Sequence, residues 1–121
     1  MSDNVAEIEP LIDGWLTVPD VAERLSEPVT KVRAQIREGK LIAVRRGDPP
    51  TLQVPAAFIG DGILLKGLPG LLTVLRDQGY TDDQALRWLF TPDDTLPGSP
   101  VQALLENRGT EVKRRAMTLG F

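Results

Sequence analysis

The basic residues of this chain are concentrated in one short stretch. Between Arg24 and Arg46 there are seven basic and two acidic residues, although the whole chain of 121 residues has a net charge of −3. Guanidinium and ammonium groups bind phosphate oxygens, and hydroxyl and amide groups can form hydrogen bonds with base edges. This chemistry suits double-stranded DNA, with the acidic residues placed elsewhere. The candidate DNA-binding residues are Thr30, Lys31, Arg33, Gln35, Arg37, Lys40, Arg45 and Arg46.

Catalytic and metal-binding chemistry has few candidate residues in this chain. The sequence has no cysteine and no histidine, which removes thiolate and imidazole ligands and the usual general base. Asp82-Asp83 falls in a predicted first helical turn, where the helix dipole favours carboxylates. Asp93-Asp94 follows a proline in a predicted turn, where aspartate is common. We therefore expect no enzymatic activity, no cofactor and no metal.

Two short helical patterns must position the candidate residues. Thr17 is the predicted N-cap of the first helix, and Pro19 and Asp20 suit its first turn. Ser26-Glu27-Pro28 interrupts the pattern, and Gly39 is expected to end the second helix. Apolar residues recur in the second helix at intervals of three and four, at Val29, Val32 and Ile36.

This periodicity orients the polar residues of the second helix away from the core. We expect Thr30, Lys31 and Gln35 to reach base edges in the major groove, which admits a helix of this kind. Arg33 and Arg37 are expected to contact phosphates, which require less exact geometry than bases.

A basic β-hairpin is predicted directly after the second helix. Residues 41–46 are the expected first strand, Gly47-Asp48-Pro49-Pro50 the turn, and residues 51–54 the return strand. Arg45 and Arg46 would then lie at the tip of a wing. An isolated helix pair would more often be a helical hairpin with a solvated charged face. The adjoining basic wing favours a winged helix-turn-helix over residues 15–60, called the winged unit below.

The chain resembles known DNA-binding families in both halves. Thr17, Ala22 and the run Glu38-Gly39-Lys40-Leu41 resemble the winged helix-turn-helix of the excisionase and MerR-like class. Residues 66–72 (KGLPGLL) and 87–93 (RWLFTPD) resemble a family of small actinobacterial DNA-binding proteins, which includes a mycobacterial Ser/Thr-kinase substrate. The resemblance implies DNA binding through the winged unit. The phosphorylation in that family lies in a threonine-containing N-terminal tail, and this sequence has no threonine before Thr17.

The segments outside the winged unit are expected to differ in character. Residues 1–14 are acidic and weakly patterned, which predicts a mobile tail. Residues 61–121, called the C-terminal half below, contain several helical patterns. Thr81 and Gln84 form a predicted capping box, and Gly109 is expected to close the helix that follows Ser99. No apolar run reaches the roughly 18 residues of a membrane span, and no secretory signal is evident, so a cytoplasmic location is expected.

A second function class is a protein–protein adaptor. The helices around Trp88 and the later Gly-x-Pro turn also resemble, over a shorter length, the toxin-binding domain of certain antitoxins. This resemblance implies a protein partner or self-association through residues 61–121. Against it, Trp88, Leu89 and Phe90 fit ordinary core positions. The favoured prediction is a mainly α fold with a small β-hairpin wing, acting as a DNA-binding regulator of transcription.

Overall fold

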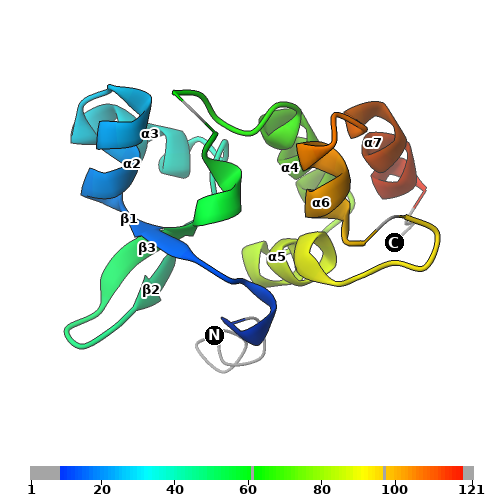
Figure 1. Ribbon diagram of the computed structural model, residues 1–121, viewed down its shortest axis with the longest axis horizontal. Coiled ribbons are helices and arrows are strands. Elements are labelled where there is room, and N and C mark those ends of the chain that lie inside the picture. Colours follow the sequence, from blue (N-terminus) through cyan, green and yellow to red (C-terminus); the bar gives the residue numbers. More distant parts are fainter. Residues whose placement is uncertain (1–8, 61, 97, 119–121) are drawn as a thin grey trace.

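The computed structural model describes residues 9–60, 62–96 and 98–118. It confirms the predicted fold class, a mainly α chain with a small antiparallel sheet (Figure 1). A 3-10 turn, η1 (Glu9–Leu11), precedes the winged unit. The winged unit contains β1 (Trp15–Thr17), α2 (Val18–Leu25), α3 (Val29–Arg37), β2 (Val44–Arg46), β3 (Thr51–Pro55) and η2 (Ala56–Phe58). The C-terminal half contains α4 (Leu68–Asp77), α5 (Asp82–Phe90), α6 (Pro100–Leu105) and α7 (Gly109–Met117).

The sheet has one strand more than the predicted hairpin. Its order is β1-β3-β2, with Leu16 opposite Val54 and Arg45 opposite Leu52. The predicted hairpin therefore exists, and β1 adds a third antiparallel strand on the other side of β3. Three residues are too few to show a strand alternation, so β1 could be found only through its distant partner. The hairpin projects away from the helices of the C-terminal half (Figure 1).

The first helix begins at the predicted cap. The Thr17 hydroxyl accepts a hydrogen bond from the Asp20 amide, and the Asp20 carboxylate accepts one from the Thr17 amide, both at 3.3 Å. This reciprocal pair satisfies two amides that a helix start leaves without internal partners. Pro28 then precedes α3 as its N-cap, as the Ser-Glu-Pro break predicted. Both helices thus begin where local side-chain chemistry requires.

The predicted first strand of the hairpin was too long. Strand β2 begins only at Val44, whereas Leu41 and Ile42 are both 1% exposed. Consecutive side chains of a strand point to opposite faces, so a strand at the edge of this sheet could not bury both in one core. These two residues instead lie in the segment between α3 and β2, where the chain bends at Lys40 and Leu41 and enters the core.

Two helices of the C-terminal half, α5 and α6, begin at the caps predicted from the sequence. The Thr81–Gln84 capping box is present, and the Ser99 hydroxyl accepts a hydrogen bond from the Gln102 amide at the start of α6. Gly109 was expected to close this helix, and that expectation was wrong. Helix α6 ends at Leu105, Asn107 takes the positive φ of 65°, and Gly109 is the first residue of α7. Within the described ranges no helix is long and apolar enough to cross a membrane.

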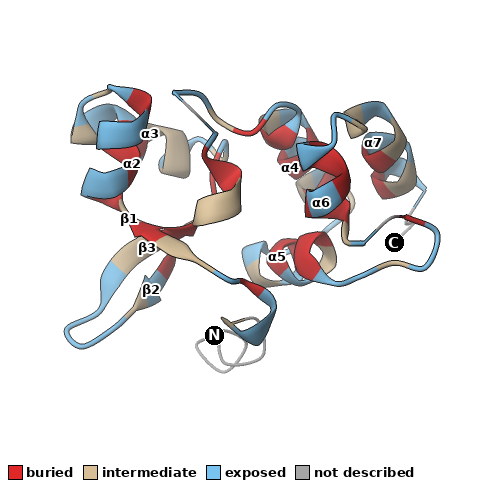
Figure 2. Ribbon diagram, in the orientation of Figure 1, coloured by how far each residue is buried: buried red, intermediate tan, exposed pale blue. Residues whose placement is uncertain are grey.

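One hydrophobic core continues across both halves of the chain. Buried residues of the winged unit and of helices α4–α7 belong to the same cluster (Figure 2). Phe58 is fully buried, and its ring centroid lies 5.7 Å from that of Phe90. The Leu65 amide also donates a 2.8 Å hydrogen bond to the Phe58 carbonyl. The core is therefore shared across the boundary predicted near residue 60.

The predicted mobile tail of residues 1–14 was too long at its C-terminal end. Glu9–Leu11 form a 3-10 turn, and Ile12 is only 5% exposed. The Gly14 carbonyl accepts a 2.9 Å hydrogen bond from the Ala56 amide. Hence residues 9–14 are part of the fold. Residues 1–8, the rest of the predicted tail, lie outside the described residues.

Replacing Ile12 with alanine should test this assignment. We expect the free energy of unfolding to fall by about 3 kcal/mol, because a buried Ile side chain is lost and a cavity is left. Urea denaturation followed by circular dichroism measures the change. Leu11→Ala is the matched control, since Leu11 is 37% exposed, and it should change stability by less than about 1 kcal/mol. Equal small effects of both variants would contradict the assignment.

Candidate nucleic-acid interface

Helix α3 presents the predicted polar residues on its outer face. Val32 is fully buried and anchors the inner face, whereas Thr30, Lys31, Arg33 and Arg37 are exposed. The periodicity in the sequence therefore predicted which side of the helix faces outward. The exposed side offers one hydroxyl and three cations, a combination suited to phosphate oxygens and base edges.

Gln35 is less available than predicted. Its side chain is half-buried, and its Nε2 atom donates a 3.5 Å hydrogen bond to Glu27 Oε1. Glu27 also holds Lys31 in an ion pair with an Nζ–Oε2 distance of 3.0 Å. Thus Glu27, in the loop before α3, orients two of the predicted contact residues. The sequence placed Glu27 in the helix break but gave no sign of these two contacts.

A groove of about 480 Å³ separates the start of α2 from α3 and the hairpin. Arg33 from α3 and Arg45 from β2 both line it, so two elements bring guanidinium groups to one surface. The first residues of α2 contribute as well, and the N-terminal end of a helix carries a partial positive charge. Sequence reasoning missed this contribution of α2. The lining residues are Thr17, Val18, Pro19, Arg33, Arg45, Pro50, Thr51 and Leu52.

Arg33, Arg37 and Arg45 of the winged unit are exposed and available to a ligand. Arg33, Arg37 and Arg45 make no ion pair and no hydrogen bond with any residue that the structure describes. The groove that Arg33 and Arg45 share has no acidic lining residue. An anion that enters it therefore meets two uncompensated guanidinium groups. Such groups form strong charge-assisted hydrogen bonds with phosphate.

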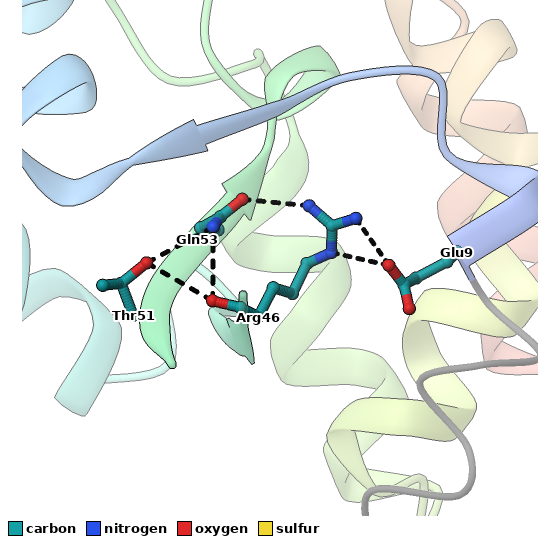
Figure 3. Close-up of polar contacts among 4 residues, drawn as sticks. All are labelled: Glu9, Arg46, Thr51 and Gln53. Atoms are coloured by element: carbon teal, nitrogen blue, oxygen red, sulfur yellow. Dashed lines mark hydrogen bonds and ion pairs between the residues drawn. The ribbon is translucent and has the colours of Figure 1, made fainter. Parts of the chain in front are cut away.

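Arg46 is held inside the fold, unlike the neighbouring Arg45 (Figure 3). Its Nε and Nη2 atoms donate to Glu9 Oε2 at 3.0 and 2.5 Å, and its Nη1 atom donates to Gln53 Oε1 at 3.0 Å. The guanidinium carbon lies 4.4 Å from the centre of the Trp15 ring, within the range of a cation–π interaction. Arg46 therefore joins η1, β1 and β3, and the structure does not place it as a free wing cation.

Lys40 lies just beyond α3 and remains accessible. Its Nζ atom is 3.4 Å from Glu38 Oε1, with the two side chains 53% and 57% exposed. An ion pair this exposed is weak, so a phosphate can displace the carboxylate. The structure therefore brings Arg33 and Arg45 together at the groove, and it leaves Arg37 and Lys40 accessible at and beyond the end of α3.

Asp93 and Asp82, from the two aspartate pairs of the sequence, have structural partners. Asp93 Oδ1 accepts hydrogen bonds from the Thr95 amide at 2.8 Å and from the Thr95 hydroxyl at 2.5 Å. These hydrogen bonds hold the pKa of Asp93 below its ordinary value. Asp82 forms an ion pair with Arg76, with an oxygen–nitrogen distance of 3.2 Å. Across residues 9–60, 62–96 and 98–118, no group of three potential ligands could hold a metal ion.

The C-terminal half presents a separate apolar hollow of about 340 Å³. Tyr80, Gln84, Arg87, Trp88 and Thr91 line it. Leu89 and Phe90 are buried, as expected for core residues, whereas Trp88 is half-buried at the surface. The three consecutive residues that were expected in the core thus divide between the core and this hollow.

Comparisons with known proteins match both halves of the chain. A family model described as "DNA-binding protein Rv2175c, wHTH domain" matches residues 6–59, and one described as "Rv2175c C-terminal domain of unknown function" matches residues 65–120. The DNA-binding protein Rv2175c of Mycobacterium tuberculosis is 44% identical over 126 residues, which cover 93% of this chain and 82% of that protein. The NMR structure of Rv2175c matches with a TM-score of 0.79 and 41% identity, covering 90% of this chain and 82% of that one.

A double-mutant cycle between Glu9→Gln and Arg46→Gln should measure the contact in Figure 3. We expect the two substitutions to be coupled by about 1 kcal/mol in the free energy of unfolding, since the pair is partly shielded and has several hydrogen bonds. Urea denaturation of the four proteins provides the values. The exposed Lys40–Glu38 pair is the control and should show coupling below about 0.5 kcal/mol. Additive effects at Glu9 and Arg46 would argue against the contact.

Proposed function

This chain belongs to the family of the DNA-binding protein Rv2175c, and we propose that it binds double-stranded DNA through its winged unit. One observation carries the proposal for this chain. Arg33 and Arg45 come from different elements, line one groove and have no acidic partner within the described residues. Two such cations beside an exposed helical face form a surface to which a phosphate backbone can bind.

The outer face of α3 is the element proposed to enter the major groove. That groove is about 12 Å wide and admits an α-helix, and a recognition helix commonly reads bases with residues of its N-terminal part. Thr30 and Lys31 lie in the first turn of α3 and are exposed, so they are the proposed base-reading residues. Gln35 is a weaker candidate than its sequence position suggested, because it is half-buried beside Glu27.

The phosphate contacts are assigned to the cations around this helix. Arg33 and Arg45 would contact one stretch of backbone across the shared groove, and Arg37 and Lys40 would hold the backbone near the C-terminal end of α3. Arg46 is assigned a structural role in the wing, since Glu9, Gln53 and Trp15 already surround its guanidinium. This assignment differs from the expectation that both wing arginines contact DNA.

A role in regulating transcription is the finer part of the proposal. A small protein that binds a DNA site can regulate transcription by occupying that site. The exposed hydroxyl and ammonium groups of α3 support recognition of base edges in addition to phosphates. Selection of fragments from the genome of the source organism by the purified chain would identify the site.

A salt titration of DNA binding should separate the proposed phosphate contacts from the structural arginine. We expect Arg33→Ala and Arg45→Ala each to weaken binding about tenfold, because a charge-assisted hydrogen bond contributes about 1.5 kcal/mol or more. Each should also lower the slope of log K against log salt by about 0.9, since one phosphate contact is lost. Fluorescence anisotropy with a labelled duplex at several salt concentrations measures both quantities.

Two further variants make this experiment decisive. Arg46→Ala should leave the salt slope unchanged, because its guanidinium contacts protein groups. Arg114→Ala, which removes an exposed arginine of α7, should change neither affinity nor slope. If wild-type binding does not depend on salt, or if Arg33→Ala and Arg45→Ala bind as tightly as the wild type, the proposed interface is wrong.

The alternative function, partner binding through the C-terminal half, is favoured by one feature. Trp88 and Tyr80 line an apolar hollow at the surface, and half-buried aromatic residues are common in protein interfaces. Sedimentation of the wild type and Trp88→Ala over a range of concentrations tests self-association. If the protein is a stable monomer and no stoichiometric protein co-purifies with it, this alternative is excluded. Partner binding by the C-terminal half and DNA binding by the winged unit are compatible with each other.

A further inference from the structure

One side chain of the C-terminal half contacts the end of the proposed recognition helix. Arg76, in the last turn of α4, donates a 2.6 Å hydrogen bond from Nη1 to the Gly39 carbonyl. Its Nη2 atom lies 3.2 Å from Asp82 Oδ1, in the first turn of α5. The guanidinium therefore connects α4 and α5 to the residue at which the chain leaves α3. The Arg76 side chain is 33% exposed, so solvent only partly screens this contact.

The local structure at Gly39 is adapted to this contact. Gly39 has a φ of +81°, and the Lys40 amide donates back to the Gln35 carbonyl at 2.9 Å, which closes the helix end. A Cβ atom at Gly39 would lie only 2.5 Å from Arg76 Nη1. Glycine thus permits both the left-handed conformation and the approach of the guanidinium. A cation at this position also interacts favourably with the negative end of the helix dipole.

The contact lies between two of the proposed DNA-binding cations. Arg37 is the last residue of α3 and Lys40 follows Gly39 directly, and both side chains are exposed. The helix itself is nine residues long, and Val32 is its one fully buried side chain. A helix this short depends on tertiary contacts for a fixed orientation. Loss of the Arg76 contact would make the end of α3 more mobile. Arg37 and Lys40 would then no longer have fixed positions.

We propose that Arg76 is a positioning residue for DNA binding, through which the C-terminal half fixes the end of α3. The inference rests on the proposed function. It gives a role in DNA binding to the C-terminal half, whose family model is described as a domain of unknown function. Arg76 acts through the Gly39 carbonyl and the placement of Arg37 and Lys40, without touching the duplex. Asp82 supports it by orienting the guanidinium.

The test compares DNA affinity and its salt dependence for Arg76→Gln and Arg76→Lys in the full chain. We expect Arg76→Gln to weaken binding about fivefold or more, the range found for residues that couple to a site at a distance. The salt slope should fall only through the phosphate contacts that Arg37 and Lys40 lose. Arg76→Lys keeps a cationic donor for the Gly39 carbonyl and should recover most of the affinity. Circular dichroism at the binding temperature establishes that each variant is folded.

Arg108→Gln is the matched control. Arg108 also forms an ion pair within the C-terminal half, with Glu111, but within the described ranges its side chain makes no hydrogen bond or ion pair with α3. Its replacement should therefore lower stability slightly and leave DNA affinity unchanged. In NMR spectra, Arg76→Gln should move the amide resonances of Gly39 and Lys40, and Arg108→Gln should not. A purely structural role of Arg76 would lower thermal stability without changing the affinity of the folded protein.

The outcomes separate this inference from the proposed function. If the wild type does not bind duplex DNA, or if Arg33→Ala binds normally, the proposed interface fails and the positioning role fails with it. If Arg33→Ala weakens binding but folded Arg76→Gln binds as the wild type does, only the positioning role is overturned. A salt slope that Arg76→Gln lowers by about 0.9 even when Arg37 and Lys40 are both replaced by alanine would also overturn it, since this would mean direct contact of Arg76 with a phosphate. If Arg76→Gln does not fold, Arg76→Lys provides the test. A folded Arg76→Lys that keeps the wild-type Gly39 resonance and binds DNA supports the role. A folded Arg76→Lys that keeps this resonance but loses binding completely contradicts it.

Discussion

The shared hydrophobic core is the constraint on which the rest of this small structure depends. The α-helices have six to ten residues and the strands three to five, lengths at which isolated helices and hairpins are marginal in water. Each element is therefore stable only because its apolar face is buried against others. The Phe58–Phe90 contact and the continuous cluster of buried residues make the two halves dependent on each other. Any surface that binds a ligand is built on this common support.

Ion pairing divides four of the arginines into two groups. Arg46 and Arg76 have acidic partners and reach main-chain or aromatic groups of distant segments, so they fix the geometry of the wing and of the end of α3. Arg33 and Arg45 are exposed at a groove without acidic residues. This division explains how a chain with a net charge of −3 can still offer a cationic surface. The local arrangement of charge, more than the total, determines which anions the surface attracts.

The sequence predicted the features that depend on neighbouring residues and missed those that depend on distant ones. The caps at Thr17, Thr81 and Ser99 and the outward face of α3 follow from spacings of three and four residues, and they were predicted correctly. The Arg46–Glu9 and Arg76–Gly39 contacts each join residues 37 positions apart, and no local pattern contains them. Strand β1 was missed for the same reason, because its signal lies in its pairing with β3. Consequently the candidate residues were found from the sequence, whereas the availability of Gln35 and Arg46 could be judged only from the structure.

The close approach of Arg76 to Gly39 has a consequence for the modularity of this fold. Winged helix-turn-helix units are often treated as portable parts that can be cut out and fused to other proteins. Here an excision at residue 60 would remove the guanidinium that binds the Gly39 carbonyl, and it would expose Phe58 by removing Phe90. A chimera would need to exchange Gly39 and Arg76 together, with the helices that carry Arg76 and Phe90. The part of this protein to fuse to another is therefore the winged unit together with the C-terminal half.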